Sequence, residues 1–402
     1  MTLEELAAWA DVPVERIDEL IAAGILRPGS DQRFAAGDVD RIRIVGAFAS
    51  ADVPLEGLVR AVRAGAVSFD YYDELHPDAT EPSDRTYGQL KDDLGTKGAL
   101  IERLLTAFGL ATPDESGRLP AEDERLVLEV AEIVASIGDP ELAIRVARLL
   151  GEGARRTSEA ALHVYGLAAD AIHAEAAGLP GEETYERYLA PWSRLARLSP
   201  RLAAWLQARH LSAAIDAYSV DATERVLEEA GFVPSRQWSP PAVAFIDLTG
   251  FTRLSEEHGD QAAASVAMQL ATLAGDVAIH RSGRVVKLLG DGALLRFDDA
   301  VAAVEASLEL LDALAATNLP QGHAGVDAGP LVVREGDVFG RTVNLAARLS
   351  DRARPGEVLV SKSVAIALPD GRFHFEPRGR VDLQGFPRPI DIVAVSTAAT
   401  QP

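Results

Sequence analysis

The chain has 402 residues, of which 48% are hydrophobic and 6% aromatic, with a formal net charge of −22 and no cysteine. This length and composition predict two or three packed domains of an ordinary soluble kind. The absence of cysteine excludes disulfides, thiolate metal sites and cysteine nucleophiles, so oxygen or imidazole must hold any metal. The acidic charge argues against broad electrostatic binding to nucleic acid or an anionic membrane. It permits a mononucleotide held by cations and a few basic side chains.

The sequence gives no sign of a membrane span or a secretory leader. Each Ala/Leu/Val run is broken by Arg, Asp or Glu before it approaches the roughly 18 to 20 apolar residues that a membrane helix needs. The first residues, "MTLEELAAWADVPVERIDEL", are acidic and amphipathic and lack the basic head of a signal peptide. We therefore expect a cytoplasmic protein.

Two helical units occupy residues 1–84 and 85–153. Each shows short amphipathic segments separated by tight breaks, in the same order. The segment "GILRP" at residues 24–28 has a counterpart in "GLATP" at residues 109–113. An internal duplication of one helical unit is the economical interpretation.

The first unit resembles the winged helix-turn-helix of the MerR family in "LAAWADVPVERIDELIAAGILRP", and the second unit resembles it less. A DNA-binding member should carry a basic recognition helix. Here that position offers Glu15, Arg16, Asp18 and Glu19, and the first 65 residues hold 11 acidic against 7 basic side chains. We expect a helical scaffold used for regulation or dimerisation, with DNA binding as the disfavoured alternative.

Residues 154–233 predict further amphipathic helices, with one helix ending before Pro200. We expect them to form a regulatory or dimerisation segment. Their apolar positions recur at three- and four-residue spacing, which fits packing within the chain or against a second copy. His163, His173 and His210 lie here. A pH-sensing role for them is a hypothesis beside the simpler structural one. Residues 234–241, "PSRQWSPP", form the clearest linker because consecutive prolines end the helix.

An α+β domain follows at residues 242–398. Three helices alternate with strands, and we expect an antiparallel hairpin at the centre of the sheet. The predicted strand segments are "AVAFIDL", "RVVKLLGDGALLRF" as the hairpin, "HAGVDAGPLVVREG" as a second strand pair, "EVLVSKSVAIAL", "FHFEPRGRVDLQGF" and "IDIVAVS".

Two aspartates stand out in this domain. Asp247 ends an apolar strand, where a carboxylate is costly unless a cation meets it. Asp291 lies between two glycines at the hairpin tip, where it has a simpler role as a turn residue. If strand and hairpin are neighbours in one sheet, the two carboxylates can converge on paired divalent cations, as in phosphoryl-transfer sites.

Three motifs, "FIDLTGFT", "VKLLGDG" and "DVFGRTVNLAARL", together resemble the class III nucleotidyl cyclases across residues 240–398. The resemblance implies an α+β fold with a ferredoxin-like, palm-type catalytic domain. The helical region before it resembles the all-α regulatory half of soluble actinobacterial adenylyl cyclases. A P-loop kinase and a diguanylate cyclase are excluded by the lack of GxxxxGK[ST] and of GG-[DE]-[DE]-F.

The resemblance also implies roles for single residues. Asp247 and Asp291 match the two metal-binding aspartates, and Ile246 would lend a backbone carbonyl to one of two Mg²⁺ or Mn²⁺ ions. Lys287 and Asp337 match the pair that recognises adenine. Guanine presents the reverse donor and acceptor pattern on that edge, so ATP is favoured over GTP.

Asn344 matches the residue that orients the ribose, and Arg348 the one that stabilises charge on the reacting phosphorus. Their i, i+4 spacing puts them on one helix face. The implied reaction is in-line attack of the ATP 3′-hydroxyl on its α-phosphorus, yielding cyclic AMP and pyrophosphate. In this family one protomer supplies the metal aspartates and the other the remaining residues, so the resemblance implies a homodimer with two sites.

One position departs from the family pattern. Where a lysine often helps to hold the triphosphate, this chain has Gln384 in "DLQGFPRP". Either Arg388 or another nearby basic residue compensates, or triphosphate affinity is weakened. An alternative for the whole chain is a MerR-like DNA-binding regulator whose cyclase domain senses a nucleotide without turning it over.

Overall fold

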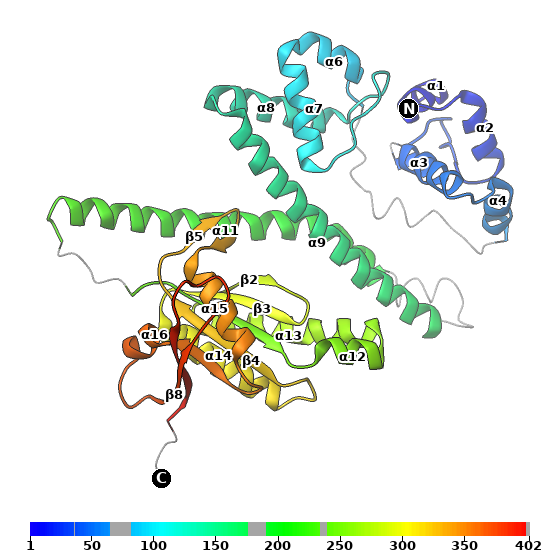
Figure 1. Cartoon of the computed structure of the whole chain (residues 1–402). Coiled ribbons are helices and arrows are strands. Elements are labelled where there is room, and N and C mark those ends of the chain that lie inside the picture. The colour runs from blue at the N-terminus through cyan, green and yellow to red at the C-terminus, as the bar shows by residue number, and fades with distance from the viewer. Residues whose placement is uncertain (36, 65–81, 176–189, 234–238, 399–402) are drawn as a thin grey trace. The chain divides into compact units, whose positions relative to one another are not determined.

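The computed structural model describes residues 1–35, 37–64, 82–175, 190–233 and 239–398. The chain divides into two compact units, Met1–Glu224 and Arg225–Pro402 (Figure 1). The first is helical, and the second combines helices with a sheet.

The first helical cluster has its own apolar core. Leu6, Ile17 and Leu20 are fully buried in it. Thr2 begins the first helix with a capping box, because its hydroxyl accepts from the backbone N–H of Glu5 while the Glu5 carboxylate accepts from the Thr2 N–H. The helices are α1 (Leu3–Ala10), α2 (Val14–Ala22), α3 (Gly37–Ser50) and α4 (Leu55–Arg63).

A second cluster follows the same local plan around a separate core. Thr86 caps its first helix through a capping box with Gln89. Gly109 ends the second helix in the left-handed region, with φ of 76°, and Gly24 after α2 has φ of 80°. The internal duplication and the MerR likeness stay predictions. The helices are α6 (Tyr87–Leu94), α7 (Thr96–Phe108), α8 (Ala121–Ile137) and α9 (Pro140–Glu175).

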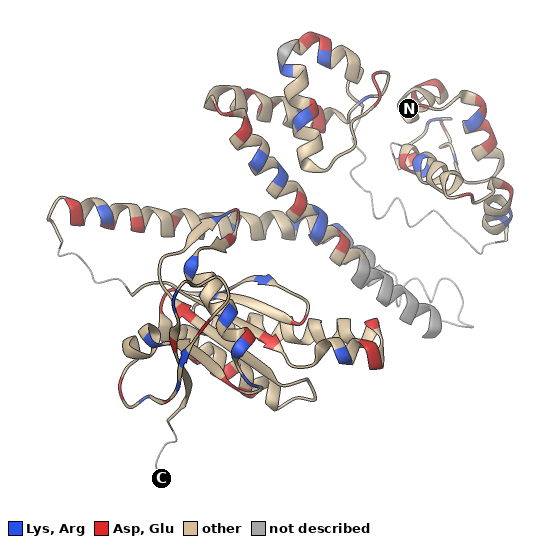
Figure 2. Cartoon of the chain, viewed as in Figure 1, with Lys and Arg blue, Asp and Glu red and all other residues tan. Residues whose placement is uncertain are grey.

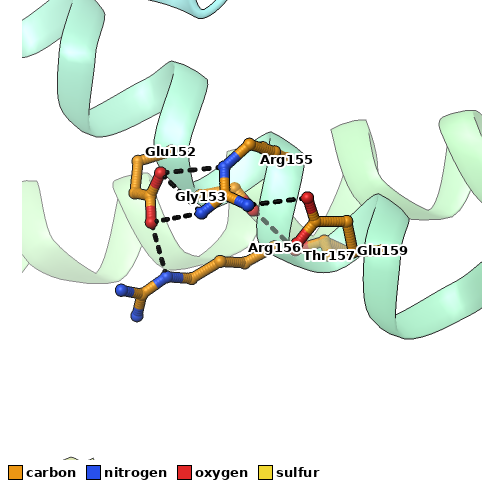
Figure 3. A network of polar contacts seen from close by, with 6 residues as sticks. All are labelled: Glu152, Gly153, Arg155, Arg156, Thr157 and Glu159. Atoms are coloured by element: carbon orange, nitrogen blue, oxygen red, sulfur yellow. Dashed lines mark hydrogen bonds and ion pairs between the residues drawn. The ribbon is translucent and has the colours of Figure 1, made fainter. Parts of the chain in front are cut away.

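Helix α9 carries an exposed ion-pair network over about two turns (Figure 3). Arg155 reaches Glu152 and Glu159 at 2.8 and 2.6 Å, and Arg156 reaches Glu152 at 2.7 Å. These hydrogen bonds lower the pKa of Glu152 to about 2. Such i, i+3 and i, i+4 pairs support a helix whose polar face is in water.

Helix α11 (Ala190–Glu229) runs unbroken through Pro200, so the predicted break there is wrong. Proline costs one helical hydrogen bond but does not have to end a long helix. His210 on α11 is exposed, while the side chains of His163 and His173 lie outside the described residues. Several apolar side chains of α11 are exposed as well: Leu195, Leu198, Leu202, Trp205, Leu211 and Ile215.

In the described part of the second unit, seven strands form one mixed sheet in the order β2-β3-β1-β4-β7-β9-β8. Strands β4 and β7 are parallel, and the other described neighbours are antiparallel. The strands are β1 (Ala242–Leu248), β2 (Arg284–Leu288), β3 (Gly292–Phe297), β4 (Gly322–Ala328), β7 (Val358–Ser361), β8 (Phe373–Val381) and β9 (Ile390–Thr397).

Helices cover both faces of this sheet. Helices α13 and α14 pack on one face, where alternate β1 residues such as Ala244 and Ile246 are buried. Helix α15 packs on the other face, which carries Val243 and Phe245. This mixed α+β architecture agrees with the fold class predicted from the sequence. The helices are α12 (Phe251–His258), α13 (Asp260–His280), α14 (Ala300–Ala315), α15 (Arg341–Arg352) and α16 (Lys362–Ala367).

Three local expectations are corrected. The β2-β3 hairpin lies at an edge of the sheet, not at its centre. Strand β4 joins the main sheet, and β5 (Val332–Arg334) pairs instead with β6 (Asp337–Phe339). Residues 362–367 form α16 because the Ser361 hydroxyl caps the backbone N–H of Val364.

Among the described helices, α13 alone is long and apolar enough to cross a membrane, by length and composition only. The sequence analysis did not identify it. Its Leu270, Ala274 and Val277 are buried in the core beneath the sheet. Core packing accounts for only part of its apolar character, because 28% of its apolar window is buried and Met268 and Ile279 are exposed.

Candidate active site

Asp247 and Asp291 meet where β1 ends. Along β1 the side chains alternate, so Asp247 shares the α15 face with Phe245. The backbone N–H of Leu248 donates to the carbonyl of Asp291 at 2.9 Å, which ties the hairpin turn to the end of β1. The predicted neighbourhood of strand and hairpin is therefore confirmed.

The Asp247 carboxyl is in an unfavourable electrostatic environment. Partial burial raises its pKa, and repulsion from Asp291 raises it further. His323 and the backbone N–H of Leu248 act in the opposite direction, and Asp351 adds a smaller repulsion. A carboxylate pair of this kind is stabilised when a cation neutralises it.

Gly292 keeps the oxygens of this site clear. It lies opposite Asp247 on β3. A Cβ at this position would lie 2.9 Å from the Ile246 carbonyl oxygen and 3.1 Å from Oδ1 of Asp247. The donor set of two carboxylates and one carbonyl is the oxygen chemistry that Mg²⁺ and Mn²⁺ prefer, so the residues fit divalent cations. Among the described residues, no group of three or more His, Asp or Glu side chains forms a metal cluster.

Lys287 and Asp337 come together from segments 50 residues apart. The Lys287 Nζ donates to Oδ2 of Asp337 at 2.6 Å, and this contact lowers the pKa of Asp337. Lys287 is on the edge strand β2, and Asp337 begins β6. Their side chains are 42% and 30% exposed, so a ligand can reach both.

Asn344 and Arg348 lie on α15, away from its buried stripe of Leu345, Ala346 and Leu349. The helix packs closely on β4 because Gly325 has no side chain: a Cβ there would be 2.2 Å from the carbonyl oxygen of Ala346.

Within one chain, Arg348 donates to Asp351 at 2.6 Å, one turn further along α15. The described side chains do not place Arg348 against the Asp247 carboxylate of the same chain.

Gln384 and Arg388 both lie exposed in the loop between β8 and β9. Whether Arg388 or another basic residue compensates for Gln384 stays a prediction.

Two further residues at the site, His323 and Asp351, escaped the sequence analysis, and Gly292 was interpreted there only as a turn residue. Strand register places Gly292 and His323 on opposite sides of Asp247. A single sequence does not reveal that register. The i, i+3 spacing of Arg348 and Asp351 could have identified their ion pair.

Residues 233–396 match the model of the adenylate and guanylate cyclase catalytic domain. An adenylate cyclase of Streptomyces griseus is 30% identical over 293 residues, which cover 70% of this chain and 68% of that protein. The chain belongs to the adenylate and guanylate cyclase family.

Similarity to other cyclases extends into the helical half. A pH-sensitive adenylate cyclase of Mycobacterium tuberculosis is 29% identical over 379 residues, covering 86% of this chain and 91% of that protein. An adenylate cyclase of Streptomyces coelicolor is 40% identical over 125 residues, 31% of this chain and 33% of that protein. The first of these matches extends well beyond the catalytic domain.

Proposed function

We propose that this cyclase converts ATP to 3′,5′-cyclic AMP and pyrophosphate, at two equivalent sites that a homodimer shares. The observation that carries the choice of base is the Lys287–Asp337 pair, joined at 2.6 Å and partly exposed. The adenylate cyclase names of its relatives support the same choice.

Lys287 and Asp337 provide one donor and one acceptor, which match the adenine edge. The lysine donates to a ring nitrogen, and the carboxylate accepts from the exocyclic amine. Guanine would set its own ring N–H against the lysine and its carbonyl against the carboxylate, so both contacts would be repulsive. Adenine binding must break the Lys287–Asp337 ion pair, and the new hydrogen bonds from Lys287 and to Asp337 must be of similar strength.

Asp247, Asp291 and the Ile246 carbonyl would hold two divalent cations, Mg²⁺ or Mn²⁺. When bound, the cations would supply Lewis acidity for the attacking 3′-hydroxyl and neutralise charge on the leaving pyrophosphate. Burial and repulsion from Asp291 both raise the pKa of Asp247, and this cost of the free carboxylate supports the assignment. Asp247 lies near the end of β1, and Asp291 lies in the turn directly before β3, where its carbonyl accepts from the backbone N–H of Leu248.

Asn344 and Arg348 act on the substrate itself. Asn344 would hydrogen-bond the ribose and align its 3′-hydroxyl with the α-phosphorus. Arg348 would donate to the phosphoryl oxygens, where charge accumulates as the bond to pyrophosphate breaks. In the isolated chain the Arg348 guanidinium is paired with Asp351, so substrate binding must break this ion pair. The free-energy cost is small because the pair is exposed.

The family resemblance implies a site that is completed by a second copy. Exposed apolar side chains on β2, its turn, β5 and β6 support the same arrangement, because a partner would cover them. They are Leu288, Leu289, Val332, Val333 and Phe339.

The helical half is proposed to regulate the cyclase, by autoinhibition and in response to pH or a ligand, in cytoplasmic signal transduction. The similarity of 86% of the chain to a pH-sensitive adenylate cyclase supports this role. Helix α1 carries Glu but no Lys or Arg, and on α2 to α4 Arg is interspersed with Asp and Glu, which disfavours the DNA-binding alternative (Figure 2). Removal of residues 1 to about 215 should raise or deregulate turnover. An unchanged rate and pH profile would contradict a regulatory role.

The test is product analysis with purified full-length protein, ATP or GTP, and Mg²⁺ or Mn²⁺ across pH 5 to 8. We expect cyclic AMP and pyrophosphate in equal amounts from ATP, and an Asp291→Ala variant that forms the dimer but no product. Equal or greater formation of cyclic GMP would contradict the base assignment. Turnover by Asp291→Ala would contradict the metal assignment.

A further inference from the structure

His323 lies directly beside Asp247 on the neighbouring strand. The antiparallel register of β1 and β4 pairs the two residues, so their side chains emerge on the same face of the sheet. The His323 side chain is 14% exposed and that of Asp247 is 45% exposed. The imidazole is therefore packed against the carboxylate and is not a free surface group.

Each ring nitrogen of His323 faces a different partner. Nδ1 lies 3.3 Å from the Thr249 hydroxyl, and Nε2 lies 4.0 Å from Oδ2 of Asp247. When the Thr249 hydroxyl donates to Nδ1, the neutral ring carries its hydrogen on Nε2, directed at the carboxylate. The 4.0 Å distance exceeds a hydrogen bond, and a rotation of either side chain would be needed to form one.

The two oxygens of Asp247 face different neighbours. Oδ1 accepts from the backbone N–H of Leu248 at 3.2 Å, and Oδ2 faces the imidazole. On the opposite side, Gly292 contributes no side chain. His323 is thus the side chain that limits rotation of this carboxylate from the β4 side.

We propose that His323 is a positioning residue that fixes the Asp247 carboxylate for divalent-cation binding, with Thr249 orienting its ring. This inference rests on the proposed cyclase function. Groups that orient a metal-binding carboxylate typically contribute 10- to 100-fold to metal affinity.

Two substitutions test the two ring nitrogens of His323 separately. In His323→Gln the longer side chain can place an amide N–H near the position of Nε2, so the contact with Asp247 is retained. In His323→Asn the amide is near the position of Nδ1, so the contact with Thr249 is retained and that with Asp247 is lost. The measurement is Mn²⁺ binding, followed by the electron paramagnetic resonance signal of free Mn²⁺. It uses the full-length dimer with an ATP analogue that has a methylene between the α- and β-phosphorus.

We expect His323→Gln to bind Mn²⁺ within about threefold of wild type and His323→Asn to bind it about 10- to 100-fold more weakly. His374→Asn is the matched control, because His374 is exposed on β8 and should leave binding unchanged. Thermal unfolding and dimer formation confirm that each variant is folded. Thr249→Val supplies a second variant, with a smaller loss of affinity expected.

Asp291→Asn separates failure of this inference from failure of the proposed function. If Asp291→Asn loses Mn²⁺ binding while His323→Asn binds as wild type does, His323 has no positioning role and the metal site stands. Equal losses in the Gln and Asn variants would also overturn the donor role. If Asp291→Asn binds Mn²⁺ normally, the metal assignment itself is wrong.

Discussion

Replacement of Gly292 by alanine tests the geometry of the metal site with a single added methyl group. The new Cβ would lie 2.9 Å from the Ile246 carbonyl oxygen and 3.1 Å from Oδ1 of Asp247. Ordinary Cβ contacts begin at 3.4 Å, so these oxygens must move by about 0.5 and 0.3 Å. Metal–ligand distances tolerate only about 0.2 Å. Both oxygens would therefore leave the range in which they can bind one cation together.

We expect Gly292→Ala to raise the Mg²⁺ or Mn²⁺ concentration needed for half-maximal turnover by about 10- to 100-fold. Crowding should also cost about 1–3 kcal/mol of stability, so thermal unfolding and dimer formation must be measured in parallel. Gly275→Ala is the matched control, because a Cβ there meets nothing within 4 Å. A folded Gly292→Ala dimer with wild-type cation dependence would refute the assignment of these oxygens.

Two further predictions concern base recognition and the core. Asp337→Asn should lower the preference for ATP over GTP by about tenfold or more, because a charge-assisted hydrogen bond contributes about 1.5–3 kcal/mol; an unchanged ratio of kcat/KM for the two nucleotides would contradict its role. Burial raises the pKa of Asp327, although the hydrogen bond from Ser361 acts in the opposite direction. The carboxyl is therefore harder to ionise in the folded than in the unfolded protein, and the fold loses stability as pH rises through the folded-state pKa. Asp327→Asn should therefore raise the Tm at pH 7.5, by about 2–4 °C per kcal/mol gained. That gain should shrink toward acid pH, and a gain that grows there would contradict this account.

The sequence predicted those parts of the catalytic unit that depend on local pattern. The apolar run of β1 and the hairpin β2-β3 lie where the strand patterns and the glycine placement indicated. The alternation of helix and strand patterns predicted the α+β fold class, and the resemblance of the three motifs to the cyclases implied the same class.

The sequence did not predict which distant segments pair with one another. The pairing of β5 with β6, and the edge position of the hairpin, depend on strand order, which no local pattern contains. His323 was missed for the same reason, because only the register of β1 with β4 places it beside Asp247. The break predicted before Pro200 is wrong for a different reason: the helical segments on both sides of this proline continue as one helix.

The central claim, a cyclase site assembled from two copies of the chain, is tested most directly by mixing two inactive variants. Asp247→Ala lacks a metal ligand, and Arg348→Ala lacks the phosphate contact. In a heterodimer one site receives both defects and the other receives neither, so an equimolar mixture should form cyclic AMP from ATP at about a quarter of the wild-type rate. A mixture that stays inactive while heterodimers demonstrably form would contradict the shared site.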